Sequence, residues 1–147
     1  IADGRGLVAA LALGAAGVQM GTRFACSQES VAHARYKQRV LEADDRATVV
    51  TGRTTGLPLR SLRNSLTEQY RALEEAGVSS EELSLFGQGR MYLGLVDGDV
   101  DDGSLLAGQI AGMIRDIKPV RAIIEEMVAE AESLIQHLGR LRSGGRT

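Results

Sequence analysis

The fold is decided by Ile1-Ala2-Asp3-Gly4-Arg5-Gly6, followed shortly by Gly17-Val18-Gln19-Met20-Gly21-Thr22-Arg23. Residues 6–13 are rich in Ala and Leu and contain no internal breaker, so a helix is predicted that starts near Gly4 and is capped by Gly14 or Gly17. Residues 18–20 predict a short buried strand. A helix leading into an apolar strand is half of a βαβ unit. We therefore predict an α/β fold and expect another strand before Ile1, with the chain beginning inside a larger unit.

Two glycine-containing loops flank this helix and strand, at residues 3–6 and 21–23. In a (β/α)₈ barrel a phosphate is often held by backbone N–H groups in the loops after strands 7 and 8. Glycine lets the backbone approach such a phosphate closely. The pattern alone leaves an alternative open, in which Gly4 and Gly21 only serve turns and Thr22 only caps a loop.

The rest of the chain is predicted to be mostly helical. A β-branched run at Thr48–Thr51 predicts a short strand. Helices are predicted at Glu29–Leu41 with Ser27 as N-cap, at Leu59–Ala76 ending at Gly77, at Ser79–Leu85 opened by a capping box, at Ser104–Ile117, and at Pro119–Leu138 with Ile123, Ile124, Met127, Ala131 and Leu134 facing inward.

Composition places the chain among ordinary globular proteins. It has 147 residues, 44% hydrophobic and 24% charged, with a formal net charge of -2. Lys and Arg are dispersed, so no nucleic-acid partner is predicted. The longest weakly polar stretch, Gly6–Gly21, is interrupted by glycines and Gln19, so no membrane segment is predicted. The single Cys26 fits a reducing, cytoplasmic setting, and no Cys/His spacing indicates a metal site.

Several motifs together resemble one enzyme family. The strand and loop residues 1–6 and 17–24 look like the strand 7 to strand 8 signature of the nitronate monooxygenases and the FabK-type enoyl-acyl-carrier-protein reductases. The likeness extends to about Met127 through His33-x-x-Tyr36-Lys37, Val50 to Arg60 with Leu62 and Asn64, Gly98-Asp99-Val100, Gly103-Ser104, and Ala107-Gly108-Gln109-Ile110-Ala111-Gly112.

The resemblance implies the C-terminal part of a TIM (β/α)₈ barrel followed by a mostly helical cover. We assign residues 1–27 to the last βα units of the FMN-binding barrel, 28–103 to a helical insertion over the barrel mouth, 104–141 to C-terminal helices, and 142–147 to a polar tail. A whole barrel needs about 250 residues. The N-terminal half would therefore have to come from the same or another chain, and a homodimer is also compatible with the resemblance.

The activity that the resemblance implies is reduction of the 2-enoyl thioester of acyl carrier protein, or of coenzyme A, with FMN as cofactor and NAD(P)H as hydride donor. This chain alone is expected to be inactive. The late Ala-Gly-Gln-Ile-Ala-Gly motif favours the reductase over the alternative, a nitronate monooxygenase that oxidises alkyl nitronates with FMN and oxygen. A second alternative is a catalytically inert fragment or module.

Carried over residue by residue, the resemblance assigns Gly21 and Thr22 to the FMN phosphate. It places Gln19 and Met20 beside the flavin pocket, with strand packing as the competing interpretation. Gln109 and Ser104 are expected near the flavin or the substrate channel, although a helix-capping role explains Ser104 equally well. The family's proton-donating histidine lies earlier in the barrel, so no catalytic residue is predicted in this chain.

Other reactive residues receive structural assignments. His33 is expected at a surface helix position and His137 in the last helix, neither as a general acid. Cys26 is expected to be a small buried residue, because no base accompanies it in the sequence. The acidic run 97–102 lacks the ligand spacing of an EF-hand and is expected to be a solvated turn.

Overall fold

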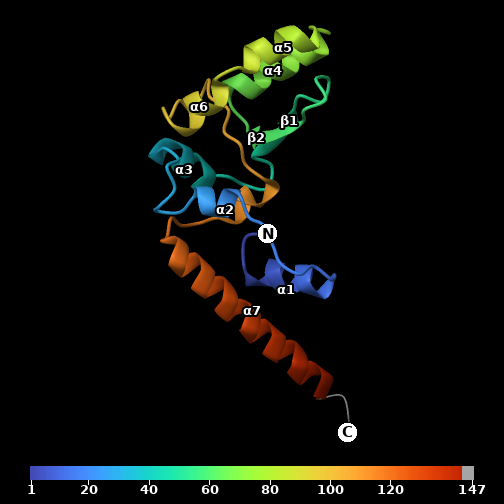
Figure 1. Cartoon of the computed structure of the whole chain (residues 1–147), viewed down its shortest axis with the longest axis vertical. Helices are drawn as coiled ribbons and strands as arrows, with labels where there is room; N and C mark the ends of the chain where they lie inside the picture. The colour runs from blue at the N-terminus through green and yellow to red at the C-terminus, as the bar shows by residue number, and fades with distance from the viewer. Residues whose placement is uncertain (144–147) are drawn as a thin grey trace.

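The computed structural model describes residues 1–143 as an elongated α/β molecule (Figure 1). The long C-terminal helix runs away from the body and carries the N-terminal helix along its side. The elements in chain order are α1 (Gly4–Ala12), α2 (Thr22–Ala25), α3 (Ala34–Leu41), β1 (Thr48–Thr51), β2 (Leu59–Leu62), α4 (Ser65–Glu75), α5 (Ser80–Gly87), α6 (Arg90–Leu95), the 3₁₀ helix η1 (Gln109–Met113) and α7 (Val120–Ser143).

The helix predicted from Gly4 is confirmed as α1, with Asp3 as its N-cap accepting the Gly6 amide at 3.0 Å. Its first residue lies against α7. A Cβ atom at Gly4 would lie 2.6 Å from both the Met127 carbonyl oxygen and the Ala131 nitrogen. Glycine at position 4 is therefore required for α1 and α7 to approach one another. This packing explains the glycine, and no phosphate contact is needed to account for it.

The strand predicted at residues 18–20 is wrong as a paired strand. These residues form no strand and no ladder with any other part of residues 1–143. A strand is defined by hydrogen bonds to a neighbour. The described chain supplies no neighbour for this segment.

The strand predicted at 48–51 is confirmed, but its partner was predicted to be helical. β1 pairs antiparallel with β2, with Thr48 opposite Leu62 and Thr51 opposite Leu59. The helix that was expected to begin at Leu59 begins instead at Ser65, where Asn64 forms a capping box with Thr67. Pairing with β1 outweighs the helical periodicity of residues 59–62.

The helix predicted at Ser104–Ile117 is also wrong. Residues 105–107 run along β2, where the Leu62 amide donates to the Leu105 carbonyl at 2.9 Å and the Ala107 amide to the Arg60 carbonyl at 3.1 Å. Only the five residues of η1 are helical. The edge of β2 offers hydrogen bonds that this segment takes in place of its own helix.

The helix predicted from Glu29 starts later than expected. α3 begins at Ala34 with His33 as N-cap, and the Ser27 hydroxyl accepts the Ser30 amide at 3.2 Å in the loop before it. The predicted capping box at Ser79 is confirmed as the start of α5.

The last helix is confirmed and is longer than predicted. α7 follows Pro119 and continues to Ser143, so it includes the first residues of the predicted polar tail, whereas residues 144–147 lie outside the described part. Ile123, Met127 and Ala131 are buried as expected. Ile124 is 47% exposed, contrary to the prediction, because α1 covers only one side of α7.

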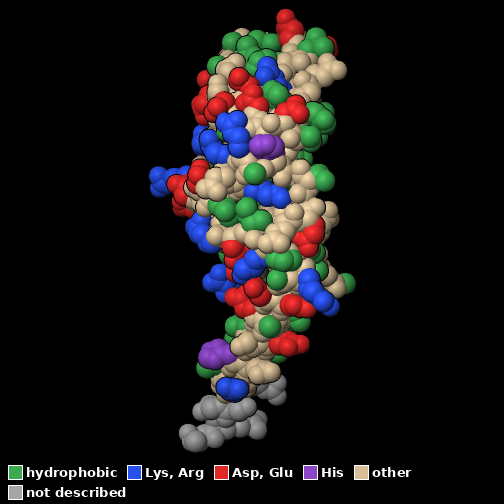
Figure 2. Space-filling model, turned by 90° about the vertical axis from the view of Figure 1, so that its left-hand side faces the viewer, with side chains coloured by type: hydrophobic (Ala, Val, Ile, Leu, Met, Phe, Trp, Pro, Cys, Tyr) green, Lys and Arg blue, Asp and Glu red, His purple; other side chains and the backbone are tan. Residues whose placement is uncertain are grey.

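The core joins segments that are far apart in sequence. Cys26, Tyr36 and Val40 pack with Leu62, Leu105, Ala111 and Ile114, all nearly inaccessible to solvent. This cluster fixes α2, α3, β2 and η1 relative to one another. Acidic and basic side chains are intermixed on the face shown in Figure 2. Within residues 1–143, no helix combines the length and apolar character needed to cross a membrane.

Candidate functional site

A groove lies where the loop after residue 20 meets the start of η1. The Gly108 amide donates a hydrogen bond to Thr22 Oγ1 at 2.9 Å, which joins two of the sequence motifs directly. We call this hollow of about 430 Å³ the Thr22 groove. It is lined by Gly21, Thr22, Ala25, Tyr36, Pro58, Leu59, Arg60, Leu95, Leu106, Ala107 and Gly108.

Consecutive backbone amides hold the two sides of the groove together. The Ala107 amide binds the Arg60 carbonyl, and the next amide, that of Gly108, binds Thr22. The phenolic oxygen of Tyr36 donates to the Leu106 carbonyl at 2.7 Å. Burial raises the pKa of Tyr36, so this phenol stays protonated and remains a donor. The wall of the groove is therefore fixed by hydrogen bonds from three elements.

Gly21 leaves an open approach to the backbone. Its φ of -90° is accessible to any residue, and a Cβ atom built there would meet nothing within 4 Å. The described part of the fold therefore does not require glycine at this position, in contrast to Gly4. An exposed glycine next to the Thr22 hydroxyl gives a phosphate room to reach the chain.

Arg60 is a groove residue that belongs to one of the sequence motifs but was not predicted as a site residue. It lies on the same face of the hairpin as Thr48, whose hydroxyl it contacts at 3.0 Å. It forms no ion pair within residues 1–143. An unpaired guanidinium in a groove with a hydroxyl and a glycine backbone is suited to bind a phosphate. Only the pairing of β1 with β2 shows that the Arg60 side chain lies on the face of the hairpin that lines the groove.

The other predicted site residues lie around the groove or away from it. Gln19 is exposed and Met20 half-buried in the unpaired segment that leads to Gly21, and neither lines the groove. Gln109 is exposed directly after Gly108. Ser104 is not a helix cap; its hydroxyl lies 3.4 Å from that of Ser61, beyond the other face of the hairpin.

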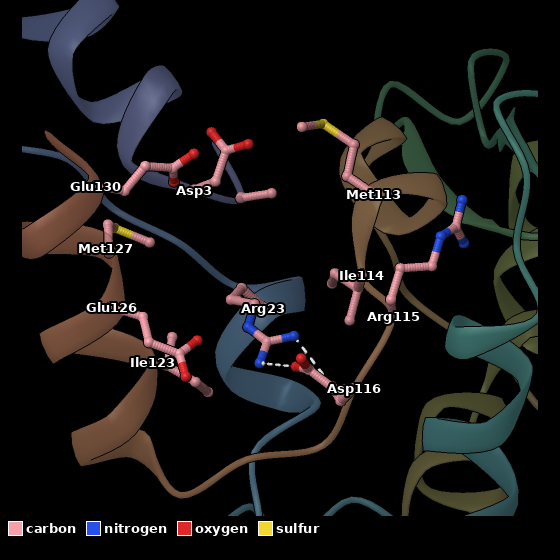
Figure 3. A pocket seen from close by; sticks show the side chains of 11 residues that line it. Asp3, Arg23, Met113, Ile114, Arg115, Asp116, Ile123, Glu126, Met127 and Glu130 are labelled. Carbon is pink, nitrogen blue, oxygen red and sulfur yellow. Dashed lines mark hydrogen bonds and ion pairs between the residues drawn. The ribbon is translucent and has the colours of Figure 1, made fainter. Parts of the chain in front are cut away.

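A second hollow lies between α1, α2, η1 and α7, and its walls are held by ion pairs (Figure 3). Arg23, only 7% exposed, donates to the Asp116 carboxylate at 2.7 Å and to the Asp116 carbonyl at 3.0 Å. Lys118 bridges Asp116 and Glu126. Glu130 accepts the Gly4 amide at 2.7 Å. The ion pairs join the start of α7 to α2. The charged side chains of this hollow therefore have structural partners, and no ligand is needed to explain them.

The remaining reactive residues have structural roles. Cys26 is completely buried, and this desolvation raises its pKa to about 11, so it is an inert thiol at neutral pH as predicted. Lys37 is also buried, and its ammonium group donates to the carbonyls of Ser27 and Ser30. His33 precedes α3 instead of lying within it, and its Nδ1 accepts the Arg35 amide at 3.1 Å.

The acidic run is a turn, as expected. The Asp99 carboxylate accepts the amides of Asp101 and Asp102 at 3.0 and 2.9 Å, and these bonds lower the pKa of Asp99. Residues 1–143 contain no cluster of three His, Cys, Asp or Glu side chains that could hold a metal ion.

Comparison with known proteins identifies the family. Residues 1–130 match the family described as nitronate monooxygenase. The chain belongs to the nitronate monooxygenase family. It superimposes on FabK from Thermotoga maritima with a TM-score of 0.88 and 42% identity, covering 96% of this chain and 45% of that one. It also superimposes on nitroalkane oxidase from Streptomyces ansochromogenes with a TM-score of 0.73 and 30% identity, covering 94% and 39%.

Two curated relatives of this nitronate monooxygenase family member differ in their named activities. A (3aS,4S,5R,7aS)-5-hydroxy-7a-methyl-1-oxo-octahydro-1H-indene-4-carboxyl-CoA dehydrogenase from Mycobacterium tuberculosis is 34% identical, covering 91% of this chain and 48% of the relative. A probable nitronate monooxygenase from Staphylococcus saprophyticus is 44% identical over 75 residues, covering 51% and 21%. The chain thus spans about half the length of its longer matches, and both of these curated relatives carry oxidoreductase names.

Proposed function

We propose that this chain is the C-terminal half of an FMN-dependent reductase of 2-enoyl thioesters, with acyl carrier protein or coenzyme A as the thioester carrier. The observation that supports it most directly is the hydrogen bond between Gly108 and Thr22. It joins the loop that the resemblance assigns to FMN phosphate to the Ala-Gly-Gln-Ile-Ala-Gly segment of the reductase branch.

The residues of the Thr22 groove fit a phosphate by their chemistry. Thr22 Oγ1 already accepts a hydrogen bond from Gly108, so its own proton is directed away and can be donated to a phosphate oxygen. The open backbone at Gly21 permits close approach, and Arg60 contributes the positive charge. FMN bound there would supply the redox chemistry, taking a hydride from NAD(P)H and giving it to the β-carbon of the enoyl thioester. The residues of this chain would bind the FMN phosphate and so orient the cofactor.

The rest of the active site is proposed to come from the N-terminal barrel strands, in the same or another chain. Residues 18–20 form no strand within the described part, and a barrel strand at this position would need a hydrogen-bonding neighbour from the N-terminal half. Leu13 at the end of α1 is 90% exposed, and α7 leaves Ile124, Val128 and Ile135 exposed. Covering these side chains with the remaining barrel would bury apolar surface.

A reductase is favoured over a nitronate monooxygenase by the comparison of solved structures. The FabK match has higher identity and a higher TM-score than the nitroalkane oxidase match over nearly the same part of the chain. A relative named as a CoA dehydrogenase also aligns with 91% of the chain. A thioester-linked substrate is therefore the better choice.

The test is a direct comparison of substrates on the chain combined with the N-terminal barrel half. We expect oxidation of NAD(P)H with a crotonyl thioester and FMN, and little consumption of oxygen with propyl nitronate. Turnover of the nitronate but not of the thioester would show that the enzyme is a nitronate monooxygenase and not a reductase. Failure to bind FMN in the combined protein, shown by an absent flavin absorbance after gel filtration, would leave the inert-module alternative.

A further inference from the structure

A further cavity lies on the opposite face of the β1–β2 hairpin from the Thr22 groove. Side chains alternate between the two faces of a strand, so Arg60 lines the groove while Ser61 lines this cavity. We call this space of about 240 Å³ the hairpin cavity. Its lining residues come mainly from the hairpin and from α4 and α5. These elements are neighbours at one end of the molecule (Figure 1).

The walls of the hairpin cavity are mainly hydrocarbon. Leu66 and Leu83 are buried at its base, and Tyr70 forms part of its side. Most of the lining hydroxyls are engaged within the protein, that of Thr67 with the Asn64 carbonyl, that of Thr55 with the Gly52 carbonyl, and that of Ser61 with Ser104. The hydroxyls of Thr51 and Ser84 complete the polar part of the wall. The mouth carries Leu57 and Leu59, which are 73% and 51% exposed. An aliphatic ligand that entered the cavity past these leucines would cover part of this exposed apolar surface.

Arg90 is the one charged residue among the described residues that line the hairpin cavity. Its guanidinium donates to the carbonyls of Phe86 and Asp102 at 3.3 and 3.2 Å and lies 5.2 Å from the centre of the Phe86 ring. It forms no ion pair within residues 1–143. Two carbonyl groups therefore fix Arg90 in place. Its charge acts on the Asp99 carboxylate without forming an ion pair with it, so the guanidinium can still bind an anion.

A hydrocarbon space with a single unpaired cation at its wall is complementary to an aliphatic chain with an anionic head. We propose that the hairpin cavity binds a medium-chain acyl ligand, with the chain between α4, α5 and the hairpin and its carboxylate on Arg90. The absence of acidic side chains among the described lining residues favours an anion over a neutral or cationic ligand. Leu59 lines both hollows, so an occupant of the cavity would lie next to the Thr22 groove.

The experiment uses the 147-residue chain itself, because every residue that lines the cavity lies between Thr51 and Ser104. Binding of decanoate, kept below its micelle-forming concentration, is measured by isothermal titration. We expect one saturable site, at least tenfold weaker binding of decanol, which lacks the charge, and no detectable binding of acetate, which lacks the chain. No saturable binding of decanoate to the folded chain would overturn the proposal.

Substitutions at two positions test the two halves of the site. Arg90→Gln should weaken decanoate binding at least tenfold, whereas Arg90→Lys should restore most of it. Gly87→Leu should abolish binding by filling the cavity, since a Cβ atom at Gly87 has only Tyr70 as a neighbour, at 3.7 Å. Arg121→Gln and Gly139→Leu on the exposed side of α7 are matched controls that should bind as the parent does, with folding of each variant checked by circular dichroism.

Equal affinity in the parent, Arg90→Gln and Gly87→Leu would show that decanoate binds elsewhere and would refute the proposal. The acyl group of a thioester substrate and a free fatty acid share the same chain, and decanoyl pantetheine distinguishes them. If this neutral thioester displaced decanoate and bound with the same affinity, the carboxylate would contribute nothing, and the proposed contact with Arg90 would be wrong. The result is separable from the proposed function, because FMN binding is read independently from flavin absorbance in the combined protein.

Discussion

The Gly108 amide and the Thr22 hydroxyl lie 2.9 Å apart although 86 positions separate them in the chain. Thr22 belongs to the first motif of the sequence and Gly108 to the last, and the bond between them closes one side of the Thr22 groove. The groove therefore exists only when α2 and η1 are both docked. Substitutions within it should report on ligand binding and on this docking separately.

Replacing the hydroxyl of Thr22 should weaken FMN binding. Thr22→Val removes both the acceptor for Gly108 and the donor proposed for the phosphate, and a hydrogen bond to a charged group contributes about 1.5–3 kcal/mol. We expect roughly a 10- to 100-fold loss of FMN affinity in the protein combined with its N-terminal half, measured by flavin fluorescence titration. Thr22→Ser should retain most of the affinity. Thr54→Val, in an exposed loop, should have no effect, and an unchanged affinity for Thr22→Val would exclude Thr22 from the site.

A methyl group at position 4 should separate α1 from α7. Gly4→Ala places a Cβ atom 2.6 Å from two backbone atoms of α7, and overpacking of this kind costs about 1–3 kcal/mol. Gly139→Ala is the matched control, because its Cβ would meet nothing within 4 Å and alanine is favoured over glycine in a helix by up to about 1 kcal/mol. Urea unfolding followed by circular dichroism should therefore shift in opposite directions for the two variants. A stabilised Gly4→Ala would contradict the described contact.

Asn64 should contribute more to stability than an ordinary helix cap. Its side-chain oxygen caps α4, while its Nδ2 donates to the carbonyls of Val100 and Gly103 at 3.0 and 2.7 Å. Asn64→Ala should cost about 2–4 kcal/mol, the sum of a cap and two further hydrogen bonds. Ser79→Ala removes only an exposed capping box and should cost about 1 kcal/mol. Equal free energies of unfolding for the two variants would show that the bonds to residues 100–103 add nothing.

The ion pair of Arg23 and Asp116 should matter to stability. Asp116→Asn would leave the guanidinium of Arg23 nearly buried without its carboxylate, at a cost of about 1–2 kcal/mol because Asp116 itself is half-exposed. Glu125→Gln, which breaks an exposed pair with Arg121, should cost less than about 0.5 kcal/mol.

The ion pair of Arg23 and Asp116 also makes the stability of the fold depend on pH. Burial acts to raise the pKa of Asp116, but hydrogen bonds from Lys118 and Arg23 outweigh it and leave the pKa below 3.8. A carboxyl with a lowered pKa in the folded state stabilises the fold above pH 3.8, and this contribution is lost as the pH falls through the folded-state pKa. Asp116→Asn should flatten that part of the stability curve measured between pH 5 and pH 2. An identical curve for parent and variant would show that another carboxyl is responsible.

Cys26 should be unreactive in the folded chain. Its buried thiol, with a pKa raised to about 11 from the usual 9.0, should resist iodoacetamide at pH 8 and react fully once the chain is unfolded in guanidinium. A raised pKa in the folded state stabilises the fold below pH 9, and this contribution is lost as the pH rises from 9.0 toward 11. Cys26→Ser should weaken that dependence, as measured by urea unfolding across the same range. Rapid alkylation of the native chain would contradict the described burial.

Residues that cap or open a helix predicted the starts of several helices correctly. Asp3, Ser79 and Pro119 each mark the start of a helix, because a cap or a fixed φ acts within a few residues. Two of the errors share one cause. Residues 59–62 and 104–107 were predicted to be helical, yet both lie in extended conformation where each supplies hydrogen bonds to the other.

The sequence by itself determined the family through an ordered set of motifs, and that resemblance implies the candidate phosphate loop at Gly21 and Thr22. The positions of most helices followed from residue types at short spacing. Only the tertiary structure decided that Gly4 is a packing residue, that Gly108 binds Thr22, and that Arg60 and Arg90 lie at hollows on opposite faces of one hairpin. Strand pairing and helix contacts join residues tens of positions apart. Their free energies depend on distances that no local pattern of residues records.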